Sequence, residues 1–363
     1  MLIVDDLEHG HRRAIKTPLY AELTGDAELA MLLELEPHPH TVTTLDVIEI
    51  RGRSGIVFEY APSTLTDLLR QHHRVASLQP SPDGRRDEPA TTNVPPLPNR
   101  LAEILQQVCD GMAHLSRITE VAHLDLKPPN VLVDKTGHAK VADFGLAQHV
   151  RIRHGRFSTA RGGTWAYAAP EVLRQEPCDT RADVFSFGVL LYEACTGRLP
   201  YPFALAPDPD TQRAQLLDYY ASSGPRHRAE ELYYWGQSTM TQVPVLPPGE
   251  GISIVLSSCL QQYTEKRPQS FGMLADMLAR SLSRPPIEAA GIPLPEIDRQ
   301  HRELALAQVL IRLGRLDEAV NRLNRLLTTP LPPELSATVV ETARKALTGA
   351  GRHAEAAALM DWR

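Results

Sequence analysis

The most informative part of this 363-residue chain reads His123-Leu124-Asp125-Leu126-Lys127-Pro128-Pro129-Asn130, and it is followed by Asp143-Phe144-Gly145. Between these motifs, residues 131–133 and 140–142 are rich in Val and have the composition of short β-strands. Residues 135–137, Lys-Thr-Gly, have the composition of a turn. The pattern predicts a β-hairpin whose two ends bring the polar side chains of both motifs to one place.

These polar side chains form the set that phosphoryl transfer from ATP requires. The reaction needs a carboxylate that orients the acceptor hydroxyl, a cation that neutralises the moving phosphoryl group, and oxygen ligands for magnesium. Asp125 suits the first task and Lys127 the second, while Asn130 and Asp143 suit the third. The alternative interpretation is a surface hairpin with scattered polar residues.

The stretch resembles the catalytic loop and the magnesium-binding turn of protein kinases. Leu124 departs from the pattern, because the family most often has Arg before the catalytic Asp. The resemblance implies an α+β, bilobal protein-kinase fold with a β-rich small lobe and a helical large lobe. Lys127, two residues after Asp125, matches Ser/Thr kinases, so the resemblance implies that Ser and Thr hydroxyls of proteins are the acceptors. We take the chain to resemble the bacterial type of these kinases.

Residues 1–61 are predicted to form the small lobe. Residues 1–16 read as two strands, and Ala14-Ile15-Lys16 resembles the kinase strand whose Lys holds the α and β phosphates. The next predicted helix carries Glu28, the expected partner of Lys16. Glu22 and Glu34 are rival candidates for this partner.

The small lobe is predicted to lack the Gly-rich loop that covers the phosphates in kinases. Fifteen residues precede Lys16, and Gly10 is the only glycine among them. A G-x-G-x-x-G loop does not fit there, which indicates a shortened small lobe. Two explanations stay open: the chain begins downstream of the true start, or the protein lacks the loop.

Residues 41–50 and 55–60 read as two further strands. The end of the second strand, Phe58-Glu59-Tyr60-Ala61, resembles the kinase hinge, where adenine pairs with backbone groups. The resemblance therefore implies that Glu59 and Ala61 contact the nucleotide. An ordinary buried strand end explains Phe58 equally well.

Residues 62–282 are predicted to form the large lobe. Within it, residues 77–98 contain six prolines and few apolar residues, which is typical of a disordered insert that serves as a linker or a docking site. Asn99 can cap the helix that follows. Apolar residues at helical spacing predict its buried face: Leu101, Ile104, Leu105, Val108, Met112 and Leu115.

Two further residues have supporting roles implied by the resemblance. Asp183 stands where the family has a buried Asp that accepts hydrogen bonds from the catalytic-loop backbone. Arg267 stands where the family has the Arg that pairs with the Glu of the Ala-Pro-Glu motif, here Glu171.

A linker over 283–299, with four prolines, is predicted to lead to a helical tail over 300–363. In the tail, residues 314–319, Gly-Arg-Leu-Asp-Glu-Ala, recur 37 residues later as residues 351–356, Gly-Arg-His-Ala-Glu-Ala. This period resembles tetratricopeptide repeats. We expect a semi-independent module that binds a protein partner. A tail packed on the large lobe, or completed by another chain, is the alternative.

The amino-acid composition argues against a nucleic-acid-binding protein, a metal site built from cysteines or a membrane-spanning protein. The net charge of −6 argues against non-specific nucleic-acid binding. The four cysteines show no metal-ligand spacing and indicate free thiols in a reducing compartment. No apolar run approaches the roughly 20 residues of a membrane span. These features predict a cytoplasmic protein.

The sequence as a whole predicts a Ser/Thr protein kinase that uses ATP and Mg²⁺ and acts on protein substrates. The first alternative is a pseudokinase scaffold that binds partners through its helical repeats. A binding protein without any nucleotide is the second.

Overall fold

The structure is a computed structural model, and it describes residues 2–6, 11–16, 26–50, 53–78, 99–119, 122–143, 165–222, 250–284 and 294–359. The chain folds as two compact units. The first comprises Met1–His38, Val42–Tyr60 and Gly291–Arg363, and the second comprises Pro39–Thr41 and Ala61–Ala290. The C-terminal residues therefore belong to the same unit as the N-terminal ones.

The first unit contains a four-stranded antiparallel sheet in the order β1-β2-β4-β3. Its elements are β1 (Leu2–Asp6), β2 (His11–Lys16), α1 (Asp26–Glu34), β3 (Thr44–Ile50) and β4 (Arg53–Glu59). Side chains alternate between the two faces of each strand, and Ile15, Leu45 and Val57 form one buried cluster. Leu294 of the C-terminal segment packs against this cluster. The strands and the helix predicted for this part of the sequence are confirmed.

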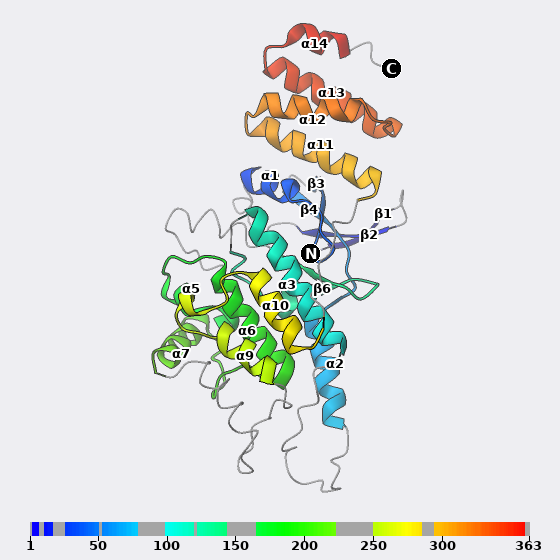
Figure 1. The fold of residues 1–363 in the computed structure, drawn as a ribbon. Coiled ribbons are helices and arrows are strands. Elements are labelled where there is room, and N and C mark those ends of the chain that lie inside the picture. Colours follow the sequence, from blue (N-terminus) through cyan, green and yellow to red (C-terminus); the bar gives the residue numbers. More distant parts are fainter. Residues whose placement is uncertain are drawn as a thin grey trace, which may run out of the picture. The chain divides into compact units, whose positions relative to one another are not determined.

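The C-terminal part of the first unit is a stack of helices in chain order (Figure 1). They are α11 (Glu296–Arg312), α12 (Leu316–Leu327), α13 (Pro333–Gly349) and α14 (His353–Ala358). The predicted linker is too long, because α11 begins at Glu296, with Glu296 and Asp298 in a first turn that favours acidic residues. The prediction of a semi-independent module also differs from the structure. The physical reason is that α11 is buried on several sides and packs against α1 and β3.

The second unit is mainly helical. Its sheet has three short strands in the order β5 (Ser63–Thr64), β6 (Val131–Val133) and β7 (Ala139–Val141). Its helices are α2 (Leu65–Leu78), α3 (Asn99–Thr119), α5 (Pro170–Arg174), α6 (Arg181–Thr196), α7 (Pro209–Ser222), α9 (Glu250–Cys259) and α10 (Phe271–Ser281). The core lies around α6, which is buried along almost its whole length, and the predicted buried face of α3 is confirmed.

The predicted hairpin at residues 131–142 is confirmed. Val131 of β6 pairs with Val141 of β7. Gly137 in the turn has φ +88°, a left-handed conformation that favours glycine, and a Cβ there would collide with the Arg100 side chain. The short, tight turn fixes the register of the two strands, and thereby the positions of the residues at their ends.

Several predicted features fall outside the described residues. Of the insert predicted at 77–98, only residues 77 and 78 are described, and they form the end of α2. No helix in the described ranges has the length and apolarity needed to span a membrane. The four cysteines are free, three of them buried and Cys178 half-buried.

A half-buried carboxylate in β3 makes the stability of the first unit depend on pH. Burial of Asp46 raises its pKa from 3.8 to about 6, although Val47 N–H donates to its Oδ1 at 2.7 Å and His301 lies nearby. The folded state therefore binds a proton between about pH 4 and pH 6 that the unfolded chain releases, so the carboxylate destabilises the fold above that window.

We therefore expect Asp46→Asn, which cannot ionise, to stabilise the protein at pH 7.5 by about 1–2 kcal/mol. The gain should be much smaller near pH 4, where the Asp46 carboxyl is protonated in the folded state and about half protonated in the unfolded chain. Thermal denaturation of both proteins at the two pH values measures this. A gain of equal size at both pH values would contradict the assignment.

Candidate active site

The segment from His123 to Asn130 brings together three of the predicted site residues. Lys127 Nζ lies 2.8 Å from Asp125 Oδ1. Asn130 Nδ2 donates to Asp125 Oδ2 and to the Asp125 backbone oxygen, both at 2.8 Å. The carboxylate of Asp125 is thus held between a cation and an amide, in an orientation fixed by two side chains.

Asp183, near the start of α6, holds this segment in place through hydrogen bonds to its backbone. Its side chain is fully buried, and its two carboxylate oxygens accept hydrogen bonds from the N–H groups of His123 at 2.6 Å and Leu124 at 2.7 Å. Burial raises the pKa of Asp183 to about 6, while the two N–H donors act in the opposite direction. The predicted supporting role of Asp183 is confirmed.

The backbone around the catalytic Asp is conformationally restrained. Leu124 has φ +61°, an uncommon value for a residue with a branched side chain. The Asp183 carboxylate accepts hydrogen bonds from the N–H of this strained residue and from the N–H of the residue before it. His123 Nε2 also lies 3.0 Å from the Ala142 backbone oxygen, which ties the segment to the end of β7. Strain maintained by several contacts is typical of a functional site.

Asp143 lies at the other end of the hairpin. The preceding residue, Ala142, donates its N–H to the Asn130 backbone oxygen at 2.8 Å, so the hairpin brings residues 130 and 143 to neighbouring positions. Asp143 has φ +58° and an exposed side chain. Phe144 and Gly145 of the same motif lie outside the described residues.

The donor set of this site fits a hard divalent cation that is also bound by phosphate groups. Because Asn130 Nδ2 makes both of its hydrogen bonds to Asp125, its Oδ1 is the atom that remains for a cation. Asp143 adds a carboxylate. Within the described ranges, no group of three or more His, Cys, Asp or Glu residues could hold a metal on its own. Magnesium is usually bound by one or two carboxylates together with substrate phosphates, so this sparse set matches it.

The predicted phosphate-binding Lys lies in the first unit. Lys16 is the last residue of β2, opposite Ile56 of β4, and its side chain is exposed. Glu28 lies in α1, but its side chain is not among those the structure describes, and Glu22 lies outside the described residues altogether. Glu34 Oε1 lies 4.0 Å from Arg315 at the start of α12, which favours Glu28 as the partner of Lys16. The pairing itself stays a prediction.

The predicted hinge residues lie at the end of β4. Glu59 is its last residue, and its carboxylate accepts a hydrogen bond from the Thr43 N–H at 2.8 Å. The Glu59 side chain therefore holds the loop that leads into β3. Ala61 follows two residues later and is half-buried. Contact of either residue with adenine stays a prediction.

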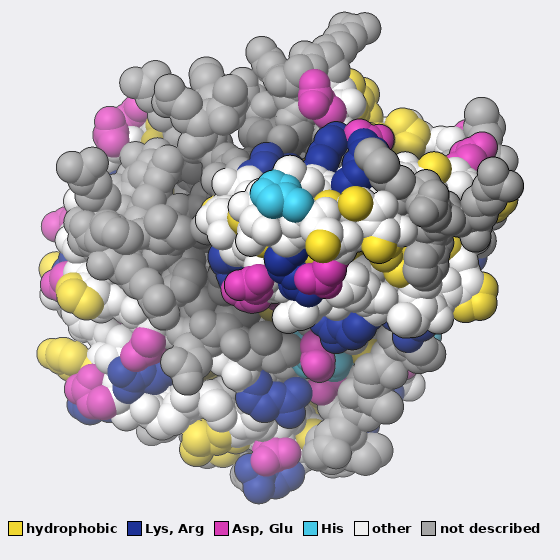
Figure 2. All heavy atoms as spheres, turned by 90° about the horizontal axis from the view of Figure 1, so that it is seen from above, with side chains coloured by type: hydrophobic (Ala, Val, Ile, Leu, Met, Phe, Trp, Pro, Cys, Tyr) yellow, Lys and Arg dark blue, Asp and Glu magenta, His cyan; other side chains and the backbone are white. Residues whose placement is uncertain are grey.

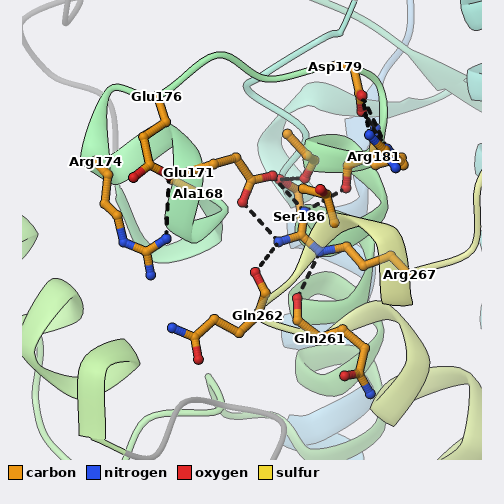
Figure 3. Close-up of polar contacts among 12 residues, drawn as sticks. Ala168, Glu171, Arg174, Glu176, Asp179, Arg181, Ser186, Gln261, Gln262 and Arg267 are labelled. Carbon is orange, nitrogen blue, oxygen red and sulfur yellow. Dashed lines mark hydrogen bonds and ion pairs between the residues drawn. The ribbon is translucent and has the colours of Figure 1, made fainter.

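The predicted pair between Glu171 and Arg267 is confirmed (Figure 3). Arg267 Nη1 and Nη2 donate to the two oxygens of Glu171 at 2.6 and 2.9 Å. The remaining N–H groups of Arg267 donate to the backbone oxygens of Arg181, Gln261 and Gln262. Both side chains are buried, and this bidentate pair ties α5 to the segment before α10.

Sequence reasoning missed the contacts that hold residues 165–167, just before α5. Gln212 Oε1 of α7 accepts the Trp165 N–H at 2.9 Å, and the Tyr167 hydroxyl donates to Glu193 of α6 at 2.5 Å. The Tyr201 hydroxyl donates to the Ala166 backbone oxygen at 2.5 Å. The partners are 26 to 47 residues apart in the sequence, and no local pattern signals their contact.

Comparison with known proteins identifies a family and several relatives of this chain. Residues 13–278 match the family model described as the protein kinase domain. Serine/threonine-protein kinase 12 of Arabidopsis thaliana is 30% identical over 244 residues, which cover 66% of this chain and 44% of that protein. CBL-interacting protein kinase 4 of Oryza sativa subsp. japonica is 37% identical over 203 residues, or 53% and 40% of the two chains.

A shorter match involves mitogen-activated protein kinase kinase kinase 13-A of Xenopus laevis. It is 41% identical over 104 residues, which cover 29% of this chain and 10% of that protein. The matched part of this chain thus spans less than half the length of each of these three relatives.

Proposed function

The chain belongs to the protein kinase family, and we propose that it transfers the γ-phosphoryl group of ATP to serine and threonine hydroxyls of proteins. The observation that carries the proposal is the cluster of Asp125, Lys127 and Asn130, joined by contacts of 2.8 Å. The names of the Arabidopsis and Xenopus relatives, both protein kinases, support it. Lys127, two residues after the catalytic Asp, favours Ser and Thr over Tyr as acceptors.

In the proposed reaction, the acceptor oxygen forms a bond to the γ-phosphorus while the bond to the β–γ bridging oxygen breaks and ADP leaves. Asp125 orients the acceptor hydroxyl and receives its proton. Lys127, which holds one oxygen of Asp125, places its positive charge beside the transferred group. The two side chains that fix Asp125 also keep it from rotating away from the acceptor.

We propose that Asn130 and Asp143 hold Mg²⁺, which supplies positive charge to the phosphates when bound. Lys16, with Glu28 as its partner, is proposed to bind the α and β phosphates. Glu59 and Ala61 are proposed to pair with adenine through their backbone groups. The sparse donor set formed by Asn130 and Asp143 supports an ion shared between protein and nucleotide.

The C-terminal helices support the second part of the proposal, a tetratricopeptide-like repeat that binds a protein partner. Gly314 and Gly351, at equivalent places in the two copies, both have φ +74°. The N–H groups of Arg315 and Arg352 bond back to Leu310 and Leu347 at the same 2.9 Å. Each Arg also pairs with the Glu three residues later. The two turns are therefore equivalent in geometry as well as in sequence.

The experiment that tests the proposed activity uses the full chain, γ-labelled ATP, Mg²⁺ and peptide libraries with Ser, Thr or Tyr as the acceptor. We expect label on Ser and Thr peptides, little on Tyr peptides, and loss of transfer when EDTA removes the metal. A chain that binds a fluorescent ATP analogue but labels no peptide and not itself would instead support the pseudokinase scaffold. A chain that binds no nucleotide would exclude the kinase activity and support a binding protein without nucleotide.

The proposal extends to the type and location of the protein. We propose a cytoplasmic kinase of the bacterial type. The acidic net charge argues against non-specific nucleic-acid binding by this protein.

A further inference from the structure

The C-terminal helices contain two different kinds of ion pair. Several of them join residues three or four positions apart and are exposed, as in Lys345–Glu341 of α13 and Arg352–Glu355 at the start of α14. Figure 2, which looks down onto this end of the stack, shows basic and acidic side chains interspersed. Pairs of this kind contribute a few tenths of a kcal/mol. Asp298 and Arg302 of α11 differ, because they are buried and bind elements more than 250 residues away in the sequence.

Arg302 of α11 binds the C-terminal end of α1. Its Nε donates to the Leu33 backbone oxygen at 2.8 Å, and its Nη2 donates to the Leu35 backbone oxygen. The last carbonyl groups of a helix have no partner inside the helix, and they carry partial negative charge. A guanidinium at this position donates hydrogen bonds to these carbonyl groups and places a positive charge beside their partial negative charge. Burial lowers the pKa of Arg302 to about 10, so the group is still charged at neutral pH.

Asp298, one turn earlier on α11, binds β2. Its Oδ1 accepts a hydrogen bond from Arg13 Nη2 at 2.7 Å, and both side chains are only 12% exposed. Arg13 lies three residues before Lys16 on the same strand. One face of α11 therefore holds both the strand that ends in Lys16 and the helix that contains Glu28.

We propose that α11 is a positioning element for the phosphate-binding part of the site, and that Arg302 and Asp298 are its positioning residues. By holding the end of α1 and the strand β2 at once, α11 fixes the distance between the backbones that carry Glu28 and Lys16. This inference rests on the proposed function for the roles of Lys16 and Glu28. It also means that a change that weakens the contacts of α11 lowers the activity, although α11 contains none of the reacting groups.

The test compares the wild type with Arg302→Met, which removes the polar contacts and keeps the side-chain bulk, and with Asp298→Asn, which removes the negative charge that pairs with Arg13. Arg322→Met is the matched control, since Arg322 of α12 pairs with Glu303 of α11, is 25% exposed and makes no contact with α1 or β2 through this pair. Arg302→Lys keeps the charge and one donor group, so it should restore part of the function. Each protein is analysed at a temperature where its circular dichroism shows it folded.

We expect amide exchange in α1 to become faster in Arg302→Met, with little change in α6. We expect kcat/KM for ATP to fall by about tenfold or more in Arg302→Met and Asp298→Asn, because small misplacements of binding groups cost this much. KM for the peptide should change little, and the Arg322→Met control should match the wild type.

Unchanged exchange in α1, or a lower melting temperature with unchanged kcat/KM for ATP, would overturn the inference. If the wild type neither binds nor uses ATP, the proposed function fails and the inference, which depends on it, falls with it. A wild type that uses ATP normally, beside an Arg302→Met variant that does so equally well, overturns the inference alone.

Discussion

Asp125→Asn is expected to reduce kcat for peptide phosphorylation by about 10³-fold or more. The amide has nearly the same shape as the carboxylate, but it cannot accept the proton of the acceptor hydroxyl. It also loses the charge that holds Lys127 at 2.8 Å. One amide orientation preserves a contact with Asn130, so the local backbone should not change. KM for ATP should stay within a few-fold of the wild type, because Asp125 orients the acceptor and does not bind ATP.

The matched control for this variant is Asp276→Asn, the same chemical change at an exposed position of α10 in the same unit. It should leave kcat, KM and the melting temperature unchanged. Steady-state kinetics with a Ser peptide measure the effect. A variant at position 125 that keeps more than a tenth of the wild-type kcat would show that another group orients the hydroxyl, and the assignment of Asp125 would be wrong.

Arg267→Met is expected to destabilise the second unit by about 3–5 kcal/mol, the cost of leaving a buried charge without its partner. All five N–H donors of Arg267 are used, two of them on Glu171. Removing the guanidinium leaves the buried Glu171 carboxylate and three backbone oxygens without this donor. The guanidinium also lies 5.1 Å from the centre of the Phe185 ring, so packing is lost as well.

The nearby pair between Arg181 and Asp179 provides the control for this second variant (Figure 3). Its two atoms are 2.7 Å apart, almost as close as those of the buried pair, but the side chains are 26% and 51% exposed. Arg181→Met should therefore cost less than about 1 kcal/mol.

A double variant, Glu171→Leu with Arg267→Met, should recover part of the loss, because it removes the unpaired charge. Chemical denaturation measures all four proteins. Equal losses in Arg181→Met and Arg267→Met would show that burial of the pair does not set its contribution.

Local sequence patterns were sufficient to predict the catalytic hairpin. Two Val-rich strands joined by a turn with glycine can pair in one register only, and this register brings residues 130 and 143 to neighbouring positions. The spacing within residues 125–130 likewise determines which side chains can reach one another over so short a segment. The apolar spacing of α3 is a further signal of the same local kind.

Contacts between distant residues needed the tertiary structure or the family resemblance. Asp183 and Glu171 were assigned through the resemblance, since nothing near them in the sequence identifies their partners 59 to 96 residues away. The predicted pairing of Lys16 with Glu28 was likewise assigned through the resemblance. The carboxylate of Glu34, a rival candidate by sequence, lies 4.0 Å from Arg315.

The position of the C-terminal helices was decided by tertiary structure alone. Their helical nature and their 37-residue period follow from the sequence, because apolar spacing and glycine turns are local properties. Proline content before the helices suggested a flexible linker, but composition does not say which surface a helix buries. That choice depends on Asp298 and Arg302 meeting Arg13 and the last carbonyl groups of α1. Such partners, more than 250 residues apart, leave no periodic signal in the chain, and only the folded structure brings them together.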